Sequence, residues 1–258
     1  MNNILGFQFI PTVQSELWVP CPKRIRAFFN GKVIADSKRT FLLRQFPMRY
    51  FFPSEDVNHS WLKANGHSST GRLGKTNNFT VTVGDRQAEN AARQYIELPE
   101  VEGQDLNGYF AFDWHSMDDW YEEDEPVTVH PRDPYIRIDT LQSSRHVKVV
   151  IAGVIIAESN RPVLLYEAGH ITRYYLYRPD VRLDLLEPSD TRTGCPYKGL
   201  ASYYSVKVGD TKIEDIIWTY PATYPECNHI QNMMCFFSEK IEEFYVDGEL
   251  LNPNPARS

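Results

Sequence analysis

A cysteine, a tyrosine and a lysine lie close together in the segment Thr193-Gly194-Cys195-Pro196-Tyr197-Lys198-Gly199. A thiol becomes a nucleophile when a nearby cation lowers its pKa. Pro196 and Gly199 predict a tight turn, which would bring the Lys198 ammonium near the Cys195 sulfur. Cys195 is therefore a candidate nucleophile. Two other readings stay open for it, a residue that lines a pocket and a small buried residue in a turn.

Lys198 has a second candidate role. Buried among aromatic rings, it could act as a base, form a Schiff base or bind an anionic group. Tyr197, Trp218 and Tyr220 supply such rings and, with one lysine, suit a flat carbonyl or aromatic ligand. The alternative is a core of packed rings with the lysine extending to solvent. Tyr203 is a further expected contact with the substrate.

Two more polar residues follow a predicted strand that ends near 166. His170 is a candidate general acid or base, because histidine titrates near neutral pH without any perturbation. Glu167 is a candidate general base or hydrogen-bonding group. An exposed loop position is the alternative for His170.

The chain contains one long pattern twice. The repeated pieces are Gly31–Ser37 and Gly153–Ser159, Arg49–Phe52 and Arg173–Leu176, Val83–Asp85 and Val208–Asp210, and Trp120–Tyr121 and Phe244–Tyr245. What both copies share is expected to be scaffold, and what one copy alone has is a candidate for chemistry. The cysteine turn and Trp218-Thr219-Tyr220 belong to the second copy, which is therefore expected to hold the competent pocket, with the first copy degenerate.

Arg173 is shared, because Arg49 stands at the matching place in the first copy. A shared arginine favours a structural ion pair, and we expect Asp180 to be the partner of Arg173 and Asp56 that of Arg49. Arg173 also borders the expected pocket, so it is a candidate substrate-binding residue.

The elements that must position these residues are predicted to be strands. Asn30-Gly31 and Ala152-Gly153 stand between β-rich runs and predict tight hairpin turns. Turn residues interrupt the chain at intervals of about 10 residues, which is typical of antiparallel sandwiches and barrels. The sequence predicts a mainly β protein of two tandem antiparallel domains. Their expected ranges are a first repeat over 1–125, a proline-rich linker over 126–140 and a second repeat over 141–258.

Composition excludes several classes of partner and cofactor. A net charge of −7 argues against nucleic acid and anionic membranes, which need a basic surface. No apolar run approaches the roughly 20 residues that span a bilayer. The four cysteines form no Cys-x-x-Cys pair and the seven histidines show no ligand spacing, so we expect reduced thiols, a cytoplasmic location, and neither metal nor other cofactor.

The motifs of the second copy resemble a known family. They are Ala157-Glu158-Ser159, Glu167, Asp180-Val181, the turn from Thr193 to Gly199, Ala201, Tyr203 and Trp218-Thr219-Tyr220. They are similar to the bacterial and fungal family 427 of domains of unknown function, also labelled nucleotidyltransferase-like. The resemblance implies a small β-tent fold, similar to zinc-binding chaperones and methionine sulfoxide reductases. The paired Cys-x-x-Cys zinc ligands of such proteins are missing here. So are the carboxylates and phosphate-binding loop that nucleotidyl transfer needs.

These observations favour a cofactor-independent enzyme of small-molecule metabolism, an isomerase or lyase that performs acid–base chemistry on a carbonyl or aromatic substrate. The alternative is a module that binds a small molecule or a peptide without turning it over. A third class is a protein-interaction domain that uses the acidic run from Asp118 to Glu125. A homodimer is left open.

Overall fold

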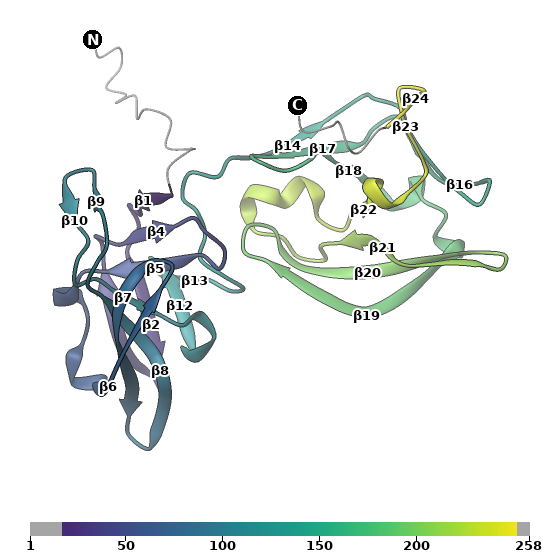
Figure 1. Cartoon of the computed structure of the whole chain (residues 1–258). Helices are drawn as coiled ribbons and strands as arrows, with labels where there is room; N and C mark the ends of the chain where they lie inside the picture. The colour runs from purple at the N-terminus through teal and green to yellow at the C-terminus, as the bar shows by residue number, and fades with distance from the viewer. Residues whose placement is uncertain (1–16, 252–258) are drawn as a thin grey trace, which may run out of the picture. The chain divides into compact units, whose positions relative to one another are not determined.

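Short β-strands make up almost all of the regular structure in both halves of the chain (Figure 1). The computed structural model describes residues 17–251, and the chain divides into two units between Tyr135 and Ile136. In the described part, helix is limited to short 3₁₀ turns. The predicted fold class, mainly β with two tandem antiparallel domains, is confirmed.

The first unit contains a seven-stranded sheet, a four-stranded sheet and a small hairpin. The large sheet has the order β1 (Trp18–Pro20), β4 (Phe41–Leu43), β5 (Arg49–Phe52), β11 (Phe110–Phe112), β8 (Arg86–Tyr95), β7 (Gly74–Val83) and β6 (Leu62–Gly71). The small sheet has the order β13 (Glu125–Pro126), β12 (Asp119–Glu122), β2 (Ile25–Phe29) and β3 (Lys32–Ser37). The remaining elements are β9 (Glu100–Val101), β10 (Gln104–Asp105), η2 (Ser54–Asp56), η3 (His59–Trp61) and η4 (Trp114–Ser116).

The second unit repeats this arrangement strand by strand. Its large sheet has the order β14 (Ile138–Gln142), β17 (Val163–Glu167), β18 (Arg173–Leu176), β22 (Met234–Phe236), β21 (Thr211–Thr219), β20 (Gly199–Val208) and β19 (Leu186–Cys195). Its small sheet has the order β16 (Val154–Ser159), β15 (Val147–Ile151), β23 (Glu243–Val246) and β24 (Glu249–Leu250). Its 3₁₀ turns are η5 (Arg178–Asp180), η6 (Leu183–Leu185), η7 (Pro225–Ile230) and η8 (Ser238–Lys240). The one clear replacement is η7, which stands where the first unit has the hairpin β9–β10.

Tight turns join the first two strands of each small sheet, as predicted. Asn30 and Gly31 have φ values of 46° and 68°, and Ala152 and Gly153 have φ values of 49° and 73°. Two successive residues with positive φ form the turn whose twist matches that of the flanking antiparallel strands. The repeat also predicts β8 correctly as a strand, although its composition would suit a helix.

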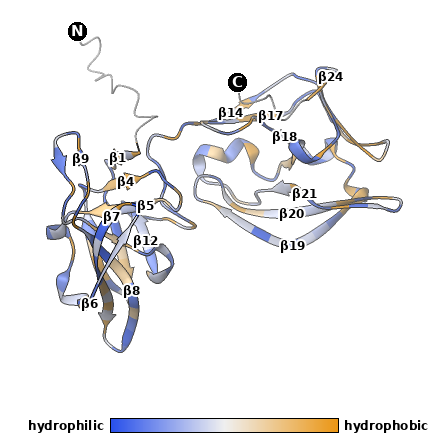
Figure 2. Ribbon diagram, in the orientation of Figure 1, coloured by the Kyte–Doolittle hydropathy of each residue, from blue (hydrophilic) through white to orange (hydrophobic). Residues whose placement is uncertain are grey.

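The large sheet buries apolar side chains on both faces. On β5, Tyr50 and Phe52 belong to the core shared with the small sheet, whereas Phe51 belongs to a cluster on the opposite face, which we call the outer face. The second unit follows the same alternation, with Leu176 in the inner core and Tyr175 on the outer face. Figure 2 shows hydrophobic colour on β4, whose three residues are all buried, and mainly hydrophilic colour along the edge strand β19. The outer face of the second unit carries several of the predicted site residues.

The expected linker over 126–140 is divided between the two units. Val127 is 6% exposed and lies in the core of the first unit. The Arg132 side chain lies 3.0 Å from the buried Glu122 carboxylate, which also accepts a 2.6 Å hydrogen bond from the Tyr50 hydroxyl. Farther along, β14 pairs with β17 as an edge strand of the second unit. The proline-rich stretch is therefore packed against the first unit up to Tyr135.

A serine, an aspartate and an arginine form the same cluster in both units. In the second unit, Asp180 accepts hydrogen bonds from Ser159 Oγ at 2.8 Å and from Arg161 Nη2 at 2.9 Å. The first unit has the equivalent cluster of Ser37, Asp56 and Arg39. The expectation that Arg173 and Arg49 are the partners of these aspartates is wrong. The serine that ends β16 turns the chain so that the arginine two residues later reaches the carboxylate.

We expect Asp180→Asn to destabilise the protein near neutral pH. The hydrogen bond from Arg161 is the main cause that lowers the pKa of Asp180, although partial burial opposes it. A carboxyl with a lowered pKa stabilises the fold above its unfolded pKa, and the contribution is lost as the pH falls through the folded value. Because Arg161 is 59% exposed, water screens the pair, so the expected loss is about 1 kcal/mol.

Urea unfolding near neutral pH and below about pH 3 measures this difference. The gap between wild type and Asp180→Asn should close in acid. The exposed Asp210→Asn serves as the control and should show no gap at either pH. Equal stability of wild type and Asp180→Asn at neutral pH would contradict the prediction.

Candidate functional site

The turn that carries the cysteine motif occupies the same place in both units. Cys195 pairs with Gly199 across the β19–β20 hairpin, as Gly71 pairs with Gly74 across β6–β7. Gly199 and Gly74 have φ values of +118° and +101°, and a Cβ there would lie 2.6 Å from the Ala222 carbonyl oxygen and 2.9 Å from that of Glu97, respectively. Glycine is therefore needed at both positions, because the turn contacts the backbone of a following segment.

In the second unit, Lys198 is held by a carboxylate. Its Nζ donates a hydrogen bond to Glu167 Oε2 at 2.6 Å, and the two side chains are only 10% and 12% exposed. The backbone of the segment that contains η7 also contacts this turn, since Tyr224 N donates to Lys198 O at 3.4 Å. The structure thus brings together two of the predicted site residues, and they neutralise each other.

The predicted aromatic wall lies in the outer-face cluster. Trp218 and Tyr220 are 7% and 6% exposed. Trp218 Nε1 donates to the Tyr175 hydroxyl at 3.2 Å, and its ring centroid lies 4.4 Å from that of Phe237. Burial raises the pKa of Tyr220 far above its ordinary value. These rings form a packed core.

Arg173 joins the same group of side chains through a different acid from the one expected. Its Nη1 and Nη2 donate to Glu239 at 2.6 and 2.9 Å, and its guanidinium lies 5.1 Å from the Trp218 ring centroid. Burial alone would lower the pKa of Arg173, but the hydrogen bonds to Glu239 and nearby negative groups outweigh it, so the pKa is raised. The second unit therefore forms two ion pairs at one end of its outer face, Lys198 with Glu167 and Arg173 with Glu239.

The other predicted residues lie around this cluster or outside it. Cys195 is partly exposed and packs against the cluster. Tyr203 stacks on Phe237 and shares a 2.6 Å hydrogen bond with Thr193. Tyr197 is half-buried in the turn, and His170 is exposed, with its backbone N–H bound to Glu167 O at 3.0 Å.

The buried thiol of Cys227, from η7, belongs to the same surroundings. Burial raises the pKa of Cys227 to about 11, although the positive charge of Lys198 opposes the shift. The predicted residues are thus gathered by packing and ion pairing, with His170 left in an exposed turn.

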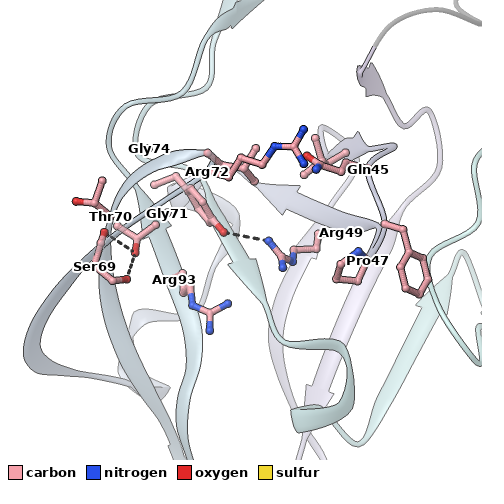
Figure 3. A pocket seen from close by; sticks show the side chains of 14 residues that line it. Gln45, Pro47, Arg49, Ser69, Thr70, Gly71, Arg72, Gly74 and Arg93 are labelled. Carbon is pink, nitrogen blue, oxygen red and sulfur yellow. Dashed lines mark hydrogen bonds between the residues drawn. The ribbon is translucent and has the colours of Figure 1, made fainter.

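The first unit has a cavity of about 390 Å³ at the equivalent end of its large sheet. Figure 3 shows that the arginines around it come from three elements, with Arg49 on β5, Arg72 in the β6–β7 turn and Arg93 on β8. Hydroxyl groups line another side, where Ser69 Oγ lies 2.8 Å from Thr76 Oγ1. No carboxylate is among the lining residues that belong to the described part of the chain, 17–251.

Strand register identifies the residues that occupy equivalent positions in the two units. Arg49 pairs with Leu43 as Arg173 pairs with Leu165, and Arg93 pairs with Ala111 as Trp218 pairs with Cys235. Counting along the chain from these pairs gives three further matches, Gln45 for Glu167, His115 for Glu239 and Leu73 for Lys198. Both carboxylates of the second unit are therefore missing in the first, and the tryptophan is an arginine.

Both copies match one sequence family. Residues 18–123 and 139–247 match the family described as "Domain of unknown function (DUF427)". The chain belongs to this family. The resemblance of the motifs and the tandem arrangement are confirmed, since each DUF427 match covers one repeat. A comparison with curated proteins found no match.

The three cavity arginines of the first DUF427 copy were not predicted from the sequence. A comparison of charge at matched positions could have predicted them. The first copy lacks the two carboxylates of the second and has an arginine in place of the tryptophan. Reactive residues that only the second copy has point instead to the other half of the chain. Within residues 17–251, no group of three or more His, Cys, Asp or Glu side chains is placed to hold a metal ion. None of the helices described is long and apolar enough to cross a membrane.

We expect Lys198→Leu to destabilise the second DUF427 copy, because it leaves the Glu167 carboxylate buried without its partner. Breaking a buried ion pair by removing one member typically costs about 3–5 kcal/mol. Adding Glu167→Gln to the same chain should restore most of the loss, since this pair of residues is the one found at the matched positions of the first copy. Urea unfolding of the wild type, the single variant and the double variant measures the effect. A single variant as stable as wild type would contradict the prediction.

Proposed function

We propose that this chain is a small-molecule binding protein whose ligand occupies the cavity of the first copy. The observation that carries the proposal is the contrast between matched positions. The second copy fills this end of its sheet with ion pairs and rings, and the first copy leaves about 390 Å³ there. Ligand sites in proteins measure roughly 300–1,000 Å³, so the cavity suits a molecule of modest size.

The cavity is lined by apolar and by polar side chains, which suits a ligand with one apolar end and one polar end. Phe46, which is 81% exposed, and Leu73 offer apolar surface at its edge, whereas Ser69, Thr70 and the arginines offer hydrogen-bond donors. Sites for small molecules combine apolar surface with a few polar groups that fix orientation. A flat carbonyl-bearing or aromatic molecule with one polar end fits this division.

The isomerase or lyase expected in the second copy stays a prediction. The groups intended for acid–base chemistry there already have partners, since Lys198 is bound by Glu167 and the Trp218 N–H by Tyr175. A substrate would have to replace those contacts, so the geometry supports binding in the first copy better. A cytoplasmic location and a homodimer also stay predictions.

The acidic run from Asp118 to Glu125 gives little support to the protein-interaction class. Asp118 is bound by Arg86 at 2.7 Å, and Asp124 is bound by Arg26 at 2.7 Å. Glu122 is buried and bound by Lys23 at 2.6 Å. Much of the charge in this run is compensated within the first unit, so it offers less attraction to a basic partner than the sequence suggests.

We expect Gly71→Trp to block the cavity without unfolding the protein. A Cβ at Gly71, which lines the cavity, would meet no heavy atom within 4 Å, and the residue does not have positive φ. A panel of small aromatic and carbonyl compounds, neutral and charged, should include members that raise the melting temperature of wild type but not of Gly71→Trp. The control is Ser68→Trp, an exposed position on the same strand outside the cavity lining, which should keep the shifts. Shifts that persist in Gly71→Trp, or no shift in wild type, would contradict the proposal.

A further inference from the structure

The cavity of the first copy concentrates positive charge, and no described residue of its lining is an acid that would balance it. Among the residues that the structure describes, no Asp or Glu oxygen lies within 4.0 Å of the side-chain nitrogens of Arg49, Arg72 or Arg93. The hydrogen bond made by Arg49 is a long one, 3.4 Å from Nη1 to the neutral Tyr95 hydroxyl. The whole chain has a net charge of −7, so the positive charge at this cavity is opposite in sign to the net charge of the protein.

The second copy shows how the same framework balances charge within the protein. Its lysine and its arginine at this end each face a carboxylate at 2.6 Å, Glu167 and Glu239. The first copy keeps the arginine as Arg49, replaces the two acids by Gln45 and His115, and places Arg93 where the tryptophan stands. The strand order of the large sheet is the same in both copies, so these matched positions differ in charge and not in strand arrangement.

Guanidinium groups that have no carboxylate partner are suited to oxoanions. Arg49 and Arg93 are half-buried, and partly buried charges gain more from an ionic partner than fully hydrated ones. The planar guanidinium presents paired N–H donors that match the oxygens of a carboxylate or a phosphate. Ser69 and Thr76, whose hydroxyls lie 2.8 Å apart, also line the cavity.

We propose that the ligand of the first copy carries an oxoanion, a carboxylate or a phosphate, bound by Arg49, Arg72 and Arg93. This rests on the proposed function and names the chemistry of its ligand. The anionic group lies among the arginines, and the remainder of the molecule extends toward the apolar edge formed by Leu73 and Phe46. The overall negative charge of the protein reduces long-range attraction, so recognition depends on contacts inside the cavity.

Three probes that differ in the charged group test the inference by calorimetry. They are phenyl phosphate, benzoate and the neutral phenol. Wild type should bind at least one of the two anions tenfold or more tightly than phenol, and the order of the two anions tells phosphate from carboxylate. Arg93→Gln and Arg49→Gln should each weaken anion binding by roughly tenfold to a hundredfold and leave phenol unaffected. The control Lys63→Gln removes one charge from an exposed site on β6 and should change nothing.

The stability of the free protein provides a second readout. Because neighbouring positive charges repel one another, Arg93→Gln should melt at the same temperature as wild type or higher when no ligand is present. A structural role for the arginine would instead lower the melting temperature, which would overturn the inference. Raising the salt concentration should weaken anion binding in wild type and leave phenol unaffected.

The outcomes separate this inference from the proposed function. Phenol binding as tight as anion binding, and blocked by Gly71→Trp, would overturn the anion assignment while leaving the cavity as a binding site. Binding of none of the probes and of no member of the compound panel would overturn both. Anion binding that survives loss of Arg49 and Arg93 but not of Lys63 would place the site elsewhere and overturn the inference.

Discussion

The large sheet of each copy has apolar side chains on both faces, so both faces need a cover. Removing such surface from water is the main favourable contribution to folding. The inner cover is the same four-stranded sheet in both copies. The outer cover differs, because the first copy uses a chain segment containing the hairpin β9–β10 and the second uses the segment containing η7. The site follows from this difference, since it lies where the outer cover meets the turn at the end of the large sheet.

The two copies treat the same end of the framework in opposite ways. In the second, carboxylates, rings and cations satisfy one another, with Glu167 on Lys198 and Glu239 on Arg173. In the first, the acids are absent and the arginines face a hollow. A duplicated domain can keep one copy as a stable scaffold while the other gives up internal pairing for recognition. Buried charge that is paired within the protein serves the fold, and charge left without a partner is available to a ligand.

The sequence predicts the fold well because strand patterns and turns are local. The Asn30-Gly31 turn and strand β8 follow from neighbouring residues and from the repeat. Contacts between distant residues are different. The pair of Arg173 with Glu239 joins residues 66 positions apart, and no local pattern separates Glu239 from Asp180 as the partner. The cavity does not follow from the sequence either, because it depends on acidic side chains that are missing at matched positions. A missing acid leaves no reactive residue in the sequence that would point to the site.

The close approach at Gly74 has a mechanical consequence. The turn that carries Arg72 touches the Glu97 backbone so tightly that a Cβ would not fit, and the chain beyond Glu97 continues into the outer cover. The turn at the rim of the cavity and the outer cover are thus in contact at one point. A shift of the outer cover near Glu97 would therefore be transmitted to the turn that carries Arg72.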